Sequence, residues 1–232
     1  MKHIIHLLLG LCLGSFFHVV VSRDDWYKGR SRCDVCGHLL HCFELVPVFS
    51  FLCQRGRCRH CKARIAPSHI ISELLMGAGY LIVSFSGFPV LEKTIAYIAV
   101  TALGFNAISD WKDGLTYTWV SYLALAVVGL IRLTTWDGFA VNLIFSIMFG
   151  VMCCLLSLIA SKYVGAGDLD IIFLLFFCCR AYAVILFLSL LITSLFFFLN
   201  SKQPAAENKV AFVPYLYLGY LGSVIVTGGV VL

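Results

Sequence analysis

Two aspartates, Asp110 and Asp168, lie at the ends of long apolar segments of this chain. An acidic side chain at membrane depth costs roughly 2.5 to 3.5 kcal/mol on insertion scales, so an acid in that place indicates a function. We therefore interpret Asp110 and Asp168 as a candidate catalytic pair.

Two glycines precede the second aspartate, in the run Val-Gly-Ala-Gly-Asp that ends at Asp168. Gly165 and Gly167 allow positive φ angles and close backbone approach, so they can bring Asp168 to a helix start without obstruction by side chains. The alternative role of such glycines is helix packing, which is common in membranes. We expect Gly165 and Gly167 to shape the site.

Two other aspartates compete with this assignment. Asp113 follows Asp110 by three residues in a short polar turn, which favours a solvated loop charge. Asp170 lies two residues after Asp168, and physical reasoning from the sequence does not choose between these two.

The composition indicates an all-α polytopic membrane protein embedded in the lipid bilayer. Hydrophobic residues make up 61% of the chain and charged residues only 12%, which excludes an ordinary soluble surface. About 20 apolar residues cross a bilayer core of about 30 Å. This rule predicts about eight membrane helices, over 4–21, 70–88, 94–109, 115–133 and 139–160, two within 169–199 divided at Arg180, and a last one from about 210. No small-residue cleavage site ends the first span, so we expect it to be retained.

The basic residues predict the orientation of these helices. Nine of the 17 lysines and arginines fall in the loop between the first two spans, which the positive-inside rule makes cytoplasmic. Threading eight spans from this loop puts thirteen of the 17 on the same side and both Asp110 and Asp168 at the cytoplasmic boundary. Because topology explains the net charge of +5, we do not expect nucleic acid as a partner.

This loop also contains two Cys-x-x-Cys pairs, Cys33 with Cys36 and Cys58 with Cys61. Four thiolates at this spacing complete a tetrahedral zinc shell, and in a polar loop the metal would supply folding energy. Disulfides are disfavoured in a reducing cytoplasm. We predict a structural zinc knuckle, with four nearby side chains as alternative ligands: His38, His41, His60 and Cys53.

The order of motifs resembles the type IV prepilin peptidases, which are prepilin leader peptidases and N-methyltransferases. The matching positions are Gly14-Ser15-Phe16, Gly29 to Cys33, Cys36, Glu44 to Pro47, Ser50 to Leu52, Arg55 to Arg59, Cys61, Glu73 to Leu75, and Phe212 to Gly219. Gly165 to Asp168 is similar to the family's GxGD box, and Ala107 to Asp110 to its first aspartate site. The resemblance favours Asp168 over Asp170. The chain departs from the family pattern at His18, Leu115, Thr116, Asp170 and Ala211.

The resemblance implies a membrane aspartic endopeptidase of the bacterial inner membrane, whose active site faces the cytoplasm. Its substrates would be type IV prepilins or pseudopilins, cut between a basic leader and a hydrophobic helix. Many family members also methylate the new N-terminus with S-adenosylmethionine, although this chain has no glycine-rich nucleotide fingerprint.

The expected domains are a first membrane helix (1–22), the zinc-binding loop (23–67) and the peptidase domain (68–232). An alternative of another class is a noncatalytic membrane transporter or assembly scaffold with a zinc knuckle. In a transporter we would expect acidic residues near the midplane of the bilayer, repeated between the two halves of the chain. The sequence contains no such repeat.

Overall fold

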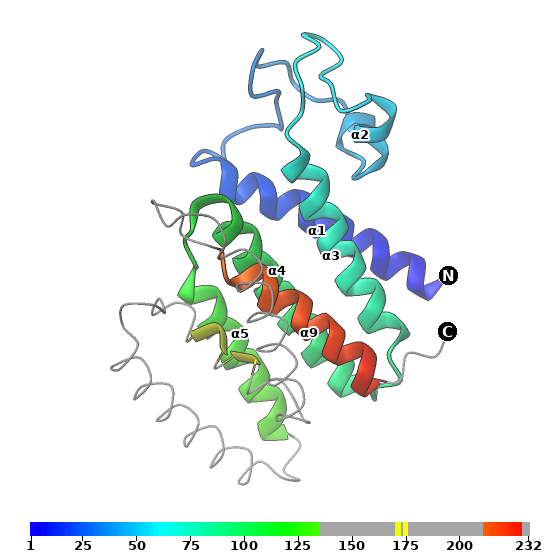
Figure 1. Ribbon diagram of the computed structural model, residues 1–232, viewed down its shortest axis with the longest axis vertical. Helices are drawn as coiled ribbons and strands as arrows, with labels where there is room; N and C mark the ends of the chain where they lie inside the picture. The colour runs from blue at the N-terminus through cyan, green and yellow to red at the C-terminus, as the bar shows by residue number, and fades with distance from the viewer. Residues whose placement is uncertain (135–169, 173, 176–210, 229–232) are drawn as a thin grey trace, which may run out of the picture. The chain divides into compact units, whose positions relative to one another are not determined.

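The computed structural model describes residues 1–134, 170–172, 174–175 and 211–228 of the chain. Within these ranges the secondary structure is helical, with two isolated β-bridges and no strand. The described chain forms two compact units, Met1–Ser84 and Phe85–Leu232, which we treat separately. Figure 1 shows the helices of each unit.

The first unit is built on two long helices, α1 (Lys2–Ser22) and α3 (Pro67–Phe85), which cross closely (Figure 1). Glycines permit the approach, because a Cβ atom on Gly10 would lie 2.6 Å from the Met76 carbonyl oxygen. A Cβ atom on Gly77 would lie 2.6 Å from Leu11 Cδ2, the flexible end of a side chain of α1. Small residues therefore bring the two backbones together, as they do in membrane helix pairs.

The segment between α1 and α3 contains a 3-10 helix, η1 (Cys42–Leu45), and a short helix, α2 (Phe49–Cys53). Two antiparallel bridges, Arg32 with Leu39 and Arg57 with Arg64, close two tight turns on either side of these helices. The loop is thus ordered by local hydrogen bonds more than by a hydrophobic core of its own.

The second unit contains α4 (Val90–Asp113), α5 (Thr118–Thr134) and α9 (Val213–Gly228), and both α5 and α9 pack on α4. Gly114 ends α4 in the left-handed region, at φ 63°, where glycine is favoured. Buried Asn106 then accepts the Tyr117 N–H at 2.7 Å, which fixes the turn into α5. At the other end Arg132 and Glu92 form a partly buried ion pair, with nitrogen to oxygen distances of 2.5 and 2.9 Å.

Five predicted spans coincide with described helices. The segments 4–21, 70–88, 94–109, 115–133 and that starting near 210 correspond to α1, α3, α4, α5 and α9. Among the described helices, α1 and α3 are long and apolar enough to cross a membrane, with mean hydropathies of 2.3 and 1.4. The spans expected at 139–160 and within 169–199 lie outside the described helices, so the predicted total of eight stays a prediction.

Candidate functional site

The four predicted zinc ligands lie together in the first unit. The sulfur atoms of Cys33, Cys36, Cys58 and Cys61 are all within 4.8 Å of one another. The Cys33 and Cys61 sulfurs are 3.9 Å apart, close to the roughly 3.8 Å edge of a tetrahedron with 2.3 Å zinc to sulfur bonds. Since every described cysteine is a free thiol, the cluster is a group of four donors that could hold a metal ion.

The two cysteine pairs sit on turns of the same geometry. In the first turn the Cys33 N–H bonds to the His38 carbonyl at 2.9 Å, and in the second the Cys58 N–H bonds to the Ala63 carbonyl at 2.8 Å. The residue four positions after each first cysteine has positive φ, 69° at Gly37 and 60° at Lys62. These repeated turns aim both pairs of sulfur atoms at one point.

The thiols influence one another electrostatically. Hydrogen bonds, first from the backbone N–H of Cys61, lower the pKa of Cys58 to about 7. At Cys36 the lowering by the His38 backbone is outweighed by burial and by the other three cysteines, which raise its pKa to about 11. The cluster therefore favours one thiolate, and a bound metal ion would release the remaining protons.

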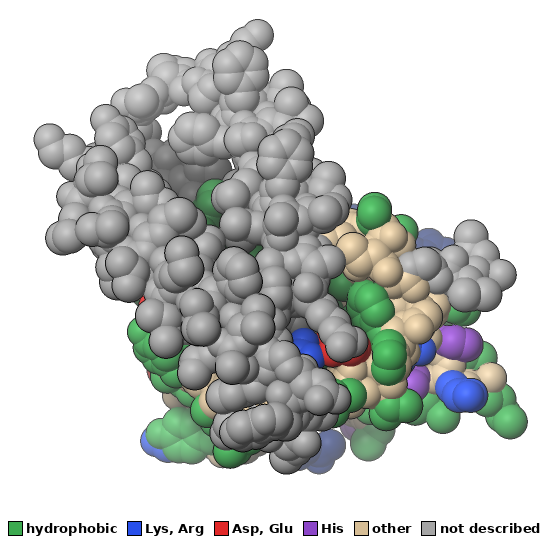
Figure 2. All heavy atoms as spheres, turned by 90° about the horizontal axis from the view of Figure 1, so that it is seen from below, with side chains coloured by type: hydrophobic (Ala, Val, Ile, Leu, Met, Phe, Trp, Pro, Cys, Tyr) green, Lys and Arg blue, Asp and Glu red, His purple; other side chains and the backbone are tan. Residues whose placement is uncertain are grey.

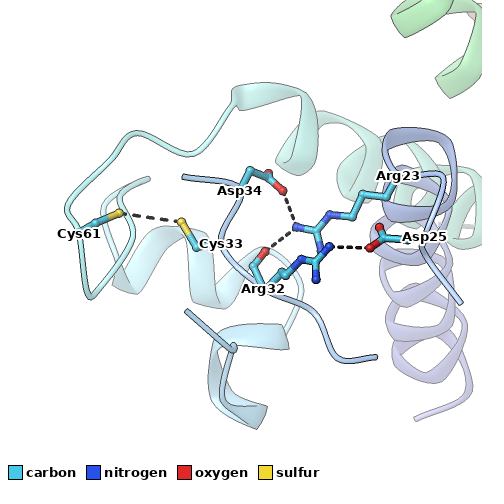
Figure 3. A network of polar contacts seen from close by, with 6 residues as sticks. All are labelled: Arg23, Asp25, Arg32, Cys33, Asp34 and Cys61. Carbon is cyan, nitrogen blue, oxygen red and sulfur yellow. Dashed lines mark hydrogen bonds and ion pairs between the residues drawn. The ribbon is translucent and has the colours of Figure 1, made fainter. Parts of the chain in front are cut away.

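A network of arginines and aspartates links the first turn to the end of α1 (Figure 3). The Arg23 guanidinium donates to the Asp34 carboxylate, between Cys33 and Cys36, and to the Arg32 carbonyl. Arg32 in turn donates to Asp25 at 2.6 Å. These contacts orient the turn that carries the first cysteine pair.

The loop is also tied to α3 by a glutamate. Buried Glu73 accepts the Val48 N–H at 2.7 Å and the Ser15 hydroxyl, and thus joins α1, the loop and α3. Val48 has a φ of 62°, which is unusual for a β-branched residue and is stabilised by this bond. A cavity of about 260 Å³ lies beside these residues, lined among others by Glu73, Glu44 and His69.

The first candidate catalytic residue, Asp110, lies in the last turn of α4 and is only 8% exposed. Its Oδ2 atom accepts the N–H of Val213, the first residue of α9, at 2.8 Å. Ser109 beside it donates to the Leu115 carbonyl at 2.7 Å. Asp110 is therefore held by both the α4 turn and the N-terminus of α9, whose partial positive charge suits a carboxylate.

The second candidate, Asp168, and the glycines Gly165 and Gly167 lie outside the described residues. The competing Asp170 is described, and its Oδ1 atom accepts the Tyr122 hydroxyl of α5 at 2.9 Å. Asp113 is exposed at the end of α4, as expected of a loop charge.

Three residues around Asp110 and the turn after α4 were not predicted from the sequence. Asn106 and Ser121 are buried polar side chains inside apolar helices and bond to each other at 3.4 Å. The sequence feature that could have indicated these two residues is a polar side chain within an apolar run. The Val213 N–H has no such signal, because it is a backbone group 103 residues from Asp110.

The N-terminal part of the chain matches a family model, the Bacterial Peptidase A24 N-terminal domain, over residues 8–86. The matched part of the chain therefore resembles the bacterial A24 peptidases. Curated relatives from Myxococcus xanthus, Burkholderia pseudomallei and Bacillus subtilis are each called prepilin leader peptidase/N-methyltransferase. The predicted resemblance to the type IV prepilin peptidases is confirmed.

The relative from Myxococcus xanthus is 43% identical over 74 residues, which cover 30% of this chain and 22% of the relative. One from Burkholderia pseudomallei is 36% identical over 101 residues, covering 31% and 33%. One from Bacillus subtilis is 26% identical over 169 residues, covering 71% and 68%. The chain thus spans about a fifth to a third of the first two relatives and about two thirds of the third. No solved structure matches the chain.

Proposed function

We propose that this chain is an aspartic endopeptidase of the bacterial inner membrane. It removes the basic leader of type IV prepilins or pseudopilins at the cytoplasmic boundary. The observation that carries the proposal is the buried Asp110 carboxylate in the last turn of α4. It accepts the N–H of Val213, the first residue of α9. A buried acid with one oxygen fixed by a backbone donor is suited to act in a catalytic pair.

In the proposed mechanism Asp110 and Asp168 share one proton across the scissile peptide bond. The ionised carboxyl removes a proton from a water molecule, which attacks the carbonyl carbon, and the protonated carboxyl stabilises the developing oxyanion. The proton then moves to the leaving amine as the bond breaks. Gly165 and Gly167 allow the backbone before Asp168 to approach the substrate closely.

The membrane location is supported by apolar side chains on the surface of the described helices. Many hydrophobic side chains lie on this surface in Figure 2. On α1 the side chains of Ile4, Ile5 and Leu8 are 61%, 59% and 53% exposed, and on α5 Leu130 is 65% exposed. A surface this apolar is unfavourable in water, and lipid is the environment that suits it.

The four-cysteine cluster is proposed to bind a structural zinc ion. The 3.9 Å separation of the Cys33 and Cys61 sulfurs suits a tetrahedral shell, and the loop has no disulfide among its described cysteines. Zinc held by these thiolates would stabilise the two turns and, through the Arg23 and Asp34 contact, the end of α1.

A second activity, N-methylation of the new N-terminus with S-adenosylmethionine, is supported by one structural observation. The cavity beside Glu73 is bounded by α1, the loop and α3, and the Glu73 carboxylate that lines it is buried. Carboxylates can bind a substrate ammonium or a sulfonium cation. Methylation is therefore the second candidate function, placed in the first unit.

The experiment that tests the peptidase is coexpression of this chain with a prepilin in membranes, followed by immunoblotting of leader removal. The parental chain and Asp113→Asn should cleave the leader, and Asp110→Asn should not. A transporter or scaffold would leave the prepilin uncut with every variant. Cleavage by Asp110→Asn at the parental rate would overturn the assignment.

A further inference from the structure

We propose that His38, His41 and Glu44 form a second metal site that binds a divalent transition ion of the zinc class. One ligand atom from each of the three residues lies within 4.8 Å of the others. The three residues belong to the loop of the first unit but use nitrogen and oxygen donors, unlike the four cysteines. This site goes beyond the peptidase and methylation activities proposed above.

The strongest reason for a cation here is the burial of Glu44. Its side chain is 1% exposed, and its Oε2 atom accepts the His41 N–H at 2.8 Å. Within the described part of the chain its buried Oε1 atom has no hydrogen-bond partner. A buried carboxylate oxygen without a partner is strongly unfavourable, and a bound cation would compensate its charge.

The local fold holds the three donors in place before any metal binds. His41 is the N-cap of η1, where its carbonyl accepts the Glu44 N–H at 2.9 Å while the Glu44 carboxylate accepts the His41 N–H at 2.8 Å. His38 is fixed by its carbonyl, which bonds to Cys33, and by parallel stacking on His60 at 5.1 Å between ring centroids. The donors therefore sit on a capped turn and a stacked ring, and few rotamers need to be ordered on binding.

The donor set selects the class of ion. Two imidazoles and one carboxylate suit zinc and similar borderline ions, whereas calcium and magnesium prefer oxygen ligands. A tetrahedral shell with bonds of about 2.0 to 2.1 Å has edges of roughly 3.3 Å. The His38 Nε2 and Glu44 Oε2 atoms are 4.0 Å apart, so binding requires a contraction of under an ångström at this edge and leaves the fourth position for water.

An ion pair between protonated His38 and Glu44 is the competing explanation. Their separation of 4.0 Å is too long for a hydrogen bond, and such a pair does not explain why His41 lies in the same cluster. The two explanations predict different metal contents, because the ion pair needs no metal.

The test is metal analysis of the purified full chain in detergent after dialysis with zinc. We expect two zinc ions per chain for the parental protein and one for the double variant His38→Ala with His41→Ala. Glu44→Gln keeps the size of the buried side chain but removes its charge, and should weaken the second site at least tenfold. His6→Ala, which removes an imidazole of α1 outside the loop, should retain two.

Cobalt substitution then identifies which site each variant loses. The intense sulfur-to-cobalt charge-transfer band of the cysteine cluster should persist in the histidine double variant. It should disappear in Cys33→Ser with Cys58→Ser, which assigns the band to the cysteine cluster. One zinc per parental chain, an unchanged content in the histidine variant, or an equal loss with His6→Ala would overturn the second site.

Discussion

The Asp110 carboxylate of α4 accepts the backbone N–H of Val213, the first residue of α9, at 2.8 Å and across 103 residues of sequence. This bond joins the two motifs that the sequence places far apart, the first aspartate site and the final Phe212 to Gly219 motif. The carboxylate therefore has an anchoring role in the second unit in addition to its proposed chemistry.

The anchoring role predicts different effects of two substitutions at Asp110. Asp110→Ala leaves the buried Val213 N–H without its acceptor, which should lower the free energy of unfolding by about 1 to 3 kcal/mol. Asp110→Asn retains an acceptor oxygen and should lower it by less than about 1 kcal/mol. Thermal unfolding in detergent measures both, with exposed Asp113→Ala as the control. Equal stability of the alanine and asparagine variants would contradict the anchor.

The glycine contact between α1 and α3 predicts a strong effect of a single methyl group. A Cβ atom on Gly10 would lie 2.6 Å from the Met76 carbonyl oxygen, and one on Gly14 would overlap the Ser72 backbone. We expect Gly10→Ala to lower the free energy of unfolding by about 1 to 3 kcal/mol, because the helices must separate. Cys12→Ala, on the exposed side of α1, should have almost no effect. The same midpoint for both variants in thermal unfolding would show that α1 and α3 do not pack this way.

The cysteine cluster predicts a coupling between metal content and loop order. Cys33→Ser should lose the zinc of this cluster and expose the segment between α1 and α3 to limited proteolysis, because the metal supplies much of its folding energy. Strong chelators should have the same effect on the parental chain. Cys42→Ser changes an exposed thiol outside the cluster and should retain the metal and the resistance. A Cys33→Ser chain with parental zinc content would refute the structural zinc ion.

The bond between Tyr122 and Asp170 provides a test of which aspartate pairs with Asp110. The Tyr122 hydroxyl donates to Asp170 at 2.9 Å, so this carboxyl already has a partner on α5. If Asp168 is the catalytic residue, Tyr122→Phe and Asp170→Asn should reduce leader cleavage by no more than about a hundredfold, the scale of one hydrogen bond to a charged group. A loss of a thousandfold or more in Asp170→Asn, with activity retained in Asp168→Asn, would transfer the role to Asp170.

The sequence predicted the presence of the helices better than their ends. The span expected at 94–109 leaves out the charged Glu92 at its N-terminal end. The helix α4 begins earlier, at Val90, and includes Glu92, which pairs with Arg132 in the same unit. The span expected from 115 begins at Thr118 instead, because Gly114 turns the chain and Asn106 binds the Tyr117 N–H. Both differences arise from contacts between segments that hydropathy along the chain does not contain.

The same distinction holds for the candidate sites. Cys-x-x-Cys spacing is local, so the four cysteines could be grouped before their sulfur atoms were seen within 4.8 Å. The burial of Glu44 and the bond from Val213 to Asp110 depend on tertiary packing, and neither was predicted. The relation of Asp168 to Asp110 stays a prediction, since Asp168 is outside the described residues.

The proposed pair is tested most directly by the rate of leader cleavage in purified Asp110→Asn, Asp168→Asn and the double variant. If the two carboxyls act as one unit, each single variant should lose at least about a thousandfold, and the double variant should lose no more than the worse single variant. Parental cleavage by either single variant, or losses that multiply in the double variant, would contradict a shared catalytic role of Asp110 and Asp168.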